Sequence, residues 1–137
     1  MYPDPEFVAQ PNPNFSHQKG VTLDLTLAHP DGSELTMPTA FDDFTAAAHR
    51  DAPRTALQEK NYQLLDTAMT AAGFVGYVNE WWDYRDTEMD AYQPLAADPN
   101  GMLIGPSAPS AVYLKCILIQ NLLPSLILIS ATKKASP

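Results

Sequence analysis

Residues 21–27 read Val-Thr-Leu-Asp-Leu-Thr-Leu, and this stretch decides the fold. Apolar and polar residues alternate strictly through it, and a period of two predicts a half-buried β-strand. The apolar residues are expected to face a core, while Asp24 lies on the polar face with the two threonines. Residues 29–32, His-Pro-Asp-Gly, predict a turn, and residues 34–37 are expected to return as a neighbouring strand.

A helix is predicted over residues 55–72. Thr55 and Gln58 have the spacing of a capping box with Thr55 as the N-cap, and Gly73 supplies the left-handed residue that ends a helix. Residues 74–82 are aromatic and β-branched enough for another strand. The expected fold is therefore α+β, a small antiparallel sheet backed by one helix. The apolar stripe of that helix is expected to contain Leu57, Asn61, Leu64, Leu65, Ala68, Met69 and Ala72.

The composition narrows the class of protein. A length of 137 residues suits one domain. Lys and Arg number 8 against 16 Asp and Glu, and this acidic balance argues against nucleic-acid binding, which needs clustered basic residues. The single cysteine, Cys116, rules out an internal disulfide and indicates a reducing, cytoplasmic setting. Residues 1–13 hold four prolines and no basic residue, so no signal peptide is expected.

The composition changes near Pro99, which divides the chain into residues 1–99 and an apolar tail, residues 100–137. Beyond Pro99 there are three lysines and no acidic residue. Residues 116–132 carry no charge, and their 17 residues lie at the lower limit for a bilayer span. Three interpretations stay open for this tail: a buried helix or strand pair, a membrane anchor, which is the least favoured, and sequence foreign to the domain.

Residues that could carry chemistry lie in two blocks, 16–24 and 73–84. A metal hydrolase needs nitrogen or oxygen ligands on rigid elements and a carboxylate that takes a proton from water. His17 lies on the loop that leads into the first strand, and Asp24 projects from the polar face of that strand. Glu80 stands beside Trp81 and Trp82 at the end of the predicted strand 74–82. Taken singly, each has an ordinary explanation as a surface, solvated or capping residue.

Together these blocks resemble the D-alanyl-D-alanine dipeptidases of the VanX type. These are zinc peptidases related to the D,D-carboxypeptidases that act on peptidoglycan peptides. The resemblance covers about residues 7–94, roughly two thirds of the chain. Its five blocks, in order, are Ser16-His17-x-x-Gly20-x-x-x-Asp24-Leu-Thr-Leu, Glu34-Leu-x-Met37, Phe41-Asp42, Gly73-Phe74 and Glu80-Trp-Trp.

The resemblance implies a site and a reaction. His17 and Asp24 would ligate one Zn²⁺ ion carried by the sheet, and Glu80 would be the catalytic base. Asp42 would receive the free amino group of the small dipeptide substrate, D-Ala-D-Ala. The other interpretation of Asp42 is a cap for a short helix over residues 44–49.

Asp83 departs from the family pattern, which is Glu-Trp-Trp-His with the histidine as third metal ligand. An Asp can bind zinc through oxygen, but a second carboxylate makes the dication a poorer Lewis acid and favours harder metals such as Mn²⁺. Alternatively, Asp83 is not a ligand and His49 or a water fills the place, while His29 in the turn is a poor candidate. Because Glu80 and Asp83 would face opposite ways in a flat strand, the chain is expected to bend at Trp81-Trp82.

The family also carries a longer N-terminal part, with an arginine that stabilises the developing oxyanion. In this chain Lys19 is the only basic residue before Arg50, apart from the histidines. We therefore expect a truncated version of the fold with slow hydrolysis, since loss of one such donor lowers the rate on the order of 100- to 1000-fold. The alternative is a non-catalytic remnant that binds a metal or a D-Ala peptide.

Overall fold

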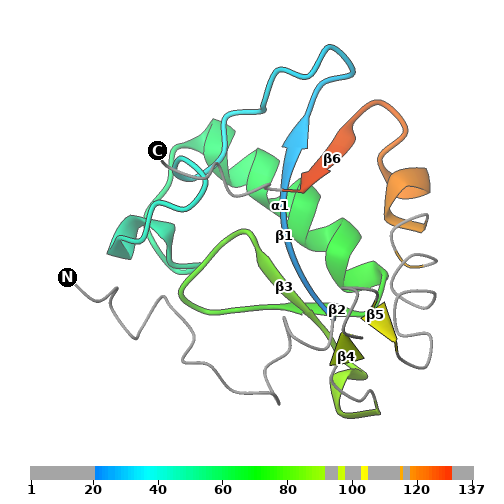
Figure 1. The fold of residues 1–137 in the computed structure, drawn as a ribbon. Coiled ribbons are helices and arrows are strands. Elements are labelled where there is room, and N and C mark those ends of the chain that lie inside the picture. Colours follow the sequence, from blue (N-terminus) through cyan, green and yellow to red (C-terminus); the bar gives the residue numbers. More distant parts are fainter. Residues whose placement is uncertain (1–20, 92–95, 98–102, 105–114, 116–117, 131–137) are drawn as a thin grey trace.

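The chain folds as an α+β domain with one helix packed across an antiparallel sheet (Figure 1). The structure, a computed structural model, describes residues 21–91, 96–97, 103–104, 115 and 118–130. Four strands form the main sheet in the order β2-β3-β1-β6, and every pair in it is antiparallel. The elements are β1 (Thr22–Ala28), η2 (Ala46–Ala48), α1 (Ala56–Ala71), β2 (Phe74–Gly76), β3 (Asp83–Asp86), η3 (Met89–Ala91), β4 (Ala96–Ala97), β5 (Leu103–Ile104) and β6 (Ile127–Ser130). The short strands β4 and β5 pair only with each other among the described residues.

Strand β1 lies at the centre and shows the predicted alternation. Val21, Leu25 and Leu27 are buried in the core on the face that α1 covers. Thr22 and Thr26, on the other face, are also buried, so the expectation of a strand buried on one side only is wrong.

The returning strand expected at residues 34–37 is wrong. The turn at residues 30–32 forms, but after it Glu34 makes only an isolated bridge to Ala28. The chain then leaves the sheet and crosses to the start of α1, where Asn61 donates to the Thr36 carbonyl and Gln58 donates to the Pro38 carbonyl. Two side chains of the helix therefore hold this segment where no strand pairing does.

Helix α1 begins and ends as predicted. Thr55 and Gln58 form a complete capping box, and Gly73 has a φ of 84°, in the left-handed region. The predicted stripe is wrong at Leu57 and Leu64, whose exposed fractions are 54% and 38%. The side of the helix that packs on the sheet is shifted towards Tyr62, which the pattern did not include. Buried on it are Asn61, Tyr62, Leu65, Ala68, Met69 and Ala72.

Residues 74–82 do not form one strand. Strand β2 ends at Gly76, residues 78–79 form a turn, and Trp81 and Trp82 lie in a bend before β3 begins at Asp83. The bend at the two tryptophans was expected. It allows the chain to reverse, so that β3 pairs with both β2 and β1.

The described part of the apolar tail belongs to the same core. Ile119 and Leu123 are buried in it, and β6 pairs with residues Leu25 to Ala28 of β1. The Lys115 ammonium bonds the buried carboxylate of Asp86 at 2.7 Å. Among the described residues, no helix is both long and apolar enough to cross a membrane. The division of the chain at residue 99 remains a proposal.

Candidate functional site

Asp24 and Asp83 lie directly opposite each other on neighbouring strands. They are register partners in the β1–β3 pair. The next pair along, Leu25 and Trp82, is the hydrogen-bonded one, since the Leu25 amide donates to the Trp82 carbonyl at 3.1 Å. Asp24 and Asp83 therefore form a non-hydrogen-bonded pair, in which the Cα atoms are about 4.5 Å apart and the side chains project to the same face. Two carboxylates from distant parts of the sequence meet on the sheet face that α1 does not cover.

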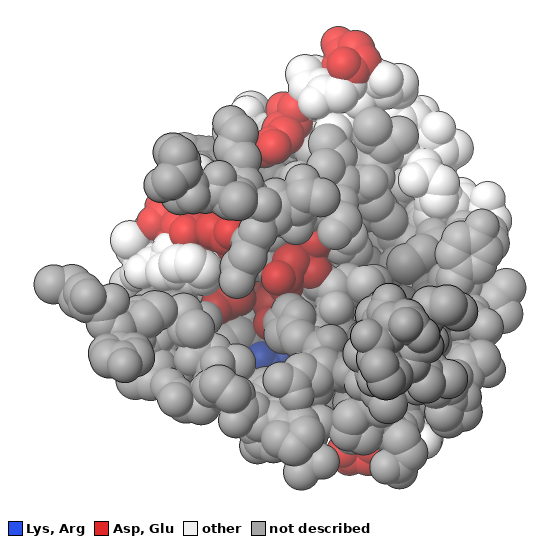
Figure 2. Space-filling view, in the orientation of Figure 1, with Lys and Arg blue, Asp and Glu red and all other residues white. Residues whose placement is uncertain are grey.

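Arg85 and Tyr77 share this face of the sheet. Arg85 lies two residues after Asp83, and its Nε is 3.4 Å from an Asp83 carboxylate oxygen. The guanidinium also stacks over the Tyr77 ring, 4.2 Å from the ring centre. Figure 2 shows acidic side chains gathered near the middle of the molecular face drawn in Figure 1, with one small basic area beside them. The charge of the two carboxylates is thus partly balanced by one arginine.

Glu80 is buried in the connection between β2 and β3, with an exposed fraction of 7%. Backbone hydrogen bonds give this connection its shape. The Tyr77 amide donates to the Asp83 carbonyl, and the Glu80 amide donates to the Tyr77 carbonyl. The Trp81 amide donates to the Ala48 carbonyl, which ties the connection to η2. These bonds fix the backbone around Glu80, whose side chain is buried there.

Four aromatic rings pack against one another, and two of them directly follow Glu80 in the chain: Phe41, Phe44, Trp81 and Trp82. The Phe41 and Trp82 ring centres are 5.2 Å apart, those of Trp81 and Trp82 are 5.3 Å apart, and the Trp81 indole donates to the Thr39 hydroxyl at 2.9 Å. These contacts bring the Phe41-Asp42 block against the Glu80-Trp-Trp block. Phe44 is partly exposed beside Trp82.

Asp42 is exposed on the segment that carries this aromatic cluster, and its φ of 58° lies in the left-handed region. Such a conformation is uncommon for a residue other than glycine, although aspartate tolerates it better than most. Asp42 does not cap the short helix, because Thr45 is the N-cap of η2 and accepts from the Ala47 amide. The capping interpretation of Asp42 is therefore wrong, and the helix expected over residues 44–49 is reduced to η2.

Arg50 was not singled out from the sequence, yet it makes the densest set of polar contacts near the candidate site. Its guanidinium donates to the carbonyls of Tyr77, Trp81 and Asp83. It also donates to the Tyr62 hydroxyl and to the Asp66 carboxylate of α1, the latter at 2.6 Å. Nothing local in the sequence could have revealed this, since every partner is at least twelve residues away.

The environment of Arg50 affects two ionisable groups. Burial raises the pKa of the Tyr84 phenol, which therefore stays neutral and donates to Asp66 at 3.1 Å. Burial opposes the charge of Arg50, but the nearby Tyr84 and Tyr62 oxygens and Asp66 outweigh burial and raise the pKa of the guanidinium. Arg50 therefore remains a fixed positive charge beneath the connection between β2 and β3.

The histidines are dispersed. His17 lies outside the described residues. His29 is exposed in the turn after β1, and His49 ends η2, where its amide donates to the Ala46 carbonyl. Within the part of the chain that the structure describes, no three His, Cys, Asp or Glu residues form a group that could hold a metal ion. The described residues thus supply two opposed carboxylates, and a third ligand would have to come from elsewhere.

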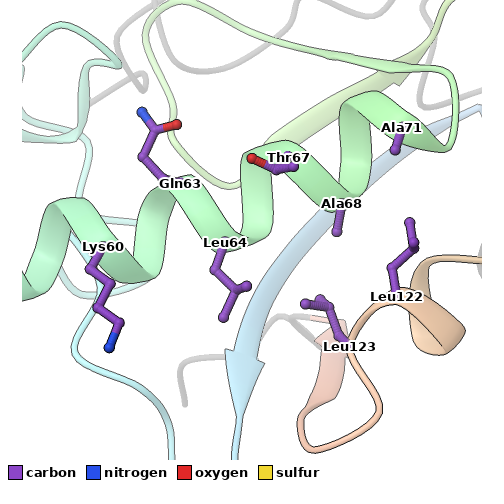
Figure 3. Close-up of a pocket in the computed structure, with 8 residues that line it drawn as sticks. All are labelled: Lys60, Gln63, Leu64, Thr67, Ala68, Ala71, Leu122 and Leu123. Carbon is purple, nitrogen blue, oxygen red and sulfur yellow. The ribbon is translucent and has the colours of Figure 1, made fainter.

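A cavity of about 410 Å³ lies away from these carboxylates, between α1 and residues 122–123 (Figure 3). No acidic residue or histidine lines it, so it offers no groups for hydrolytic chemistry. The lining consists of Lys60, Gln63, Leu64, Thr67, Ala68, Ala71, Leu122 and Leu123.

A protein-family model described as D-ala-D-ala dipeptidase, within the M15 peptidases, matches residues 3–98. The chain belongs to this family. The match contains all five sequence blocks that carry the resemblance, so the family assignment made from those blocks is confirmed. His17, Asp24, Asp42, Glu80 and Asp83 all lie inside it.

Curated members of the dipeptidase family give the extent of the similarity. The D-alanyl-D-alanine dipeptidase of Escherichia coli is 34% identical over 105 residues, which are 76% of this chain and 54% of the relative. Those of Enterococcus faecalis and Streptomyces coelicolor are each 39% identical over 72 residues, about half of this chain and 36% and 35% of the relatives. The chain thus spans about half the length of the first relative and about a third of the other two. No solved structure gives a significant match.

Proposed function

We propose that this chain carries the metal site and the catalytic base of a peptidase that hydrolyses D-alanyl-D-alanine, a dipeptide of peptidoglycan metabolism. Membership of the dipeptidase family supports the reaction class and the substrate. The observation that carries the proposal for the site is the direct opposition of Asp24 and Asp83 across β1 and β3. A cytoplasmic setting, expected from the single cysteine, is part of the same proposal.

The opposed carboxylates fit a divalent cation. Like charges directly opposite each other in a sheet destabilise it, and a cation between them converts that repulsion into attraction. Carboxylate oxygens bind Zn²⁺ and are still better ligands for Mn²⁺. His17 would complete the donor set, because it lies seven residues before Asp24 on the segment that leads into β1. We propose one ion, Zn²⁺ or Mn²⁺, held by His17, Asp24 and Asp83.

When bound, such an ion acts as a Lewis acid towards the scissile carbonyl and the attacking water. Glu80 takes the proton of that water on its carboxylate and returns it to the leaving amino group. Asp42 receives the free amino group of the dipeptide through a charge-assisted hydrogen bond. The aromatic cluster that includes Trp81 and Trp82 limits the access of other water. Exclusion of water strengthens the electrostatic interactions of Glu80 and Asp42 with the substrate.

Asp83 in place of the family histidine predicts slow turnover. A second carboxylate ligand reduces the effective charge of the ion, and its ion pair with Arg85 competes with the metal for the same oxygen. A rate well below the ordinary range of roughly 1 to 1000 per second is therefore expected.

The test combines a metal titration with an assay of D-alanine release from D-Ala-D-Ala, using Zn²⁺ and then Mn²⁺. Glu80→Gln should keep the metal affinity of the unmodified chain and lose D-alanine release by about 100- to 10,000-fold. Asp24→Asn should weaken metal binding itself. Metal binding without any D-alanine release would favour the non-catalytic remnant, and the absence of metal binding would refute the site.

A further inference from the structure

We propose that Arg50 is a positioning residue that holds residues 77–83 in the shape required by Glu80 and Asp83. The proposal rests on the function proposed above, because those two residues matter only if they serve the site. Arg50 itself lies beneath the segment and contacts its backbone, so it acts on the chemistry through the segment that it holds.

Every donor of the Arg50 guanidinium is used. Nε donates to the Tyr77 carbonyl at 2.8 Å, and the two hydrogens of one terminal nitrogen go to the Trp81 and Asp83 carbonyls, both at 3.2 Å. The other terminal nitrogen bonds the Tyr62 hydroxyl at 3.1 Å and the Asp66 carboxylate at 2.6 Å. A guanidinium has five N–H donors in a fixed planar fork, and here all five have partners.

These partners belong to two different elements. Three are carbonyls of the segment 77–83, and they lie on both sides of Glu80 in the chain. The other two are side chains of α1. The Arg50 amide also donates to the Val78 carbonyl, which adds a fourth hydrogen bond to the same segment. Arg50 therefore joins the rigid helix to the connection that carries the proposed base and one proposed ligand.

Gly76 makes room for this arrangement. A Cβ built on Gly76 would lie 1.8 Å from Cζ of Arg50, far closer than two carbons can approach. The guanidinium also stacks over the ring of Tyr84, the register partner of Gly76, 4.3 Å from the ring centre. The charged group is thus in contact with both the glycine and the aromatic ring, and both contacts restrict where its plane can lie.

Lysine could not replace Arg50. Its ammonium is a compact point charge on a flexible stem and cannot reach three carbonyls and two side chains in one plane. Loss of the guanidinium would leave the carbonyls of Tyr77, Trp81 and Asp83 without that donor in a partly buried place. The segment would then rearrange, and Asp83 would move relative to Asp24.

The experiment compares Arg50→Ala and Arg50→Lys with Arg54→Ala as a matched control. The Arg54 side chain is as well buried, and it bonds Glu59 and the carbonyls of His49 and Arg50. For each of the three variants we would measure amide hydrogen exchange in residues 77–83, Zn²⁺ affinity and urea unfolding. Added guanidinium ion would be tested for rescue of Arg50→Ala.

In Arg50→Ala we expect the amides of residues 77–83 to exchange on the order of tenfold faster than in Arg54→Ala. Zn²⁺ affinity should fall by about 10- to 100-fold, as for other groups that orient metal ligands. Added guanidinium ion should restore part of the slow exchange and part of the Zn²⁺ affinity of Arg50→Ala. Arg50→Lys should keep little of either. Equal exchange of residues 77–83 in Arg50→Ala and Arg54→Ala would overturn the proposal.

Two further results separate this inference from the proposed function. If the unmodified chain binds no Zn²⁺, the proposed function fails, and unchanged exchange in residues 77–83 would then refute the role of Arg50 as well. If Arg50→Ala does not fold, Gly76→Ala replaces it, because the added methyl displaces the guanidinium without removing its charge. Exchange in residues 77–83 that is unaltered by Gly76→Ala would also count against the proposal.

Discussion

Ile119→Ala should destabilise the protein strongly, although residue 119 lies outside the region that matches the dipeptidase family. The Ile119 side chain is completely buried, and it belongs to the same core as Leu27, Leu65 and Phe74. If the apolar tail is part of the domain, this side chain contributes to folding as much as one from β1 or α1. If the tail were foreign to the domain, truncating the Ile119 side chain would change the free energy of unfolding little.

The size of the effect follows from the burial. Replacing isoleucine by alanine removes three carbons, at about 0.8 kcal/mol for each buried methylene, or about 2.4 kcal/mol in transfer free energy. The cavity that remains adds to this, so a loss of about 2–5 kcal/mol in the free energy of unfolding is expected. A domain of this size has a total stability of roughly 5–15 kcal/mol, so the variant should be close to unfolding.

Leu118→Ala is the matched control, since it removes an aliphatic side chain from the adjacent position. Leu118 is 45% exposed, so about half of its transfer free energy is already missing and the loss should be about 1 kcal/mol. Both variants would be measured by urea unfolding, with the midpoint and the slope fitted together. Equal losses in the two variants, or less than about 1 kcal/mol for Ile119→Ala, would refute the argument that the tail completes the core.

Two further predictions concern the site and the attachment of the tail. Asp83→His should strengthen Zn²⁺ binding at the proposed site by about tenfold or more, because it supplies a nitrogen ligand and removes one of two opposed carboxylates. Unchanged affinity in a competition titration would mean that Asp83 does not contact the metal. Burial opposes the charge of Lys115, but its hydrogen bonds to Asp86 and Glu88 outweigh burial and raise its pKa. The charged Lys115 therefore contributes its full stabilisation below about pH 10.4, the pKa in the unfolded chain. This stabilisation is lost as the pH rises through the higher pKa of the folded state. The difference in unfolding free energy between wild type and Lys115→Met should therefore shrink over that pH range. If that difference in unfolding free energy stayed constant between pH 8 and 11.5, the predicted role of Lys115 would be contradicted.

The sequence alone determined those parts of this protein that depend on interactions between residues close together in the chain. The alternation in residues 21–27 identified β1, because side chains on a strand must point to opposite faces. Thr55, Gln58 and Gly73 marked both ends of α1, because caps depend on neighbours within one turn. The five blocks also identified the family, because the residues of a motif and their order are read directly from the sequence.

Only the tertiary structure decided which residues lie opposite each other on neighbouring strands. Asp24 and Asp83 are fifty-nine positions apart in the sequence, and a shift of one residue in the β1–β3 register would send one of them to the other face. The place of β6 beside β1 and the five hydrogen bonds of the Arg50 guanidinium likewise depend on partners far along the chain. Hydrophobic periodicity also put Leu57 and Leu64 on the wrong side of α1, because it gives the period of a helix and not the direction from which the sheet approaches. Patterns within a few residues follow from covalent geometry, whereas register and burial are set by contacts that form only when the whole chain has folded.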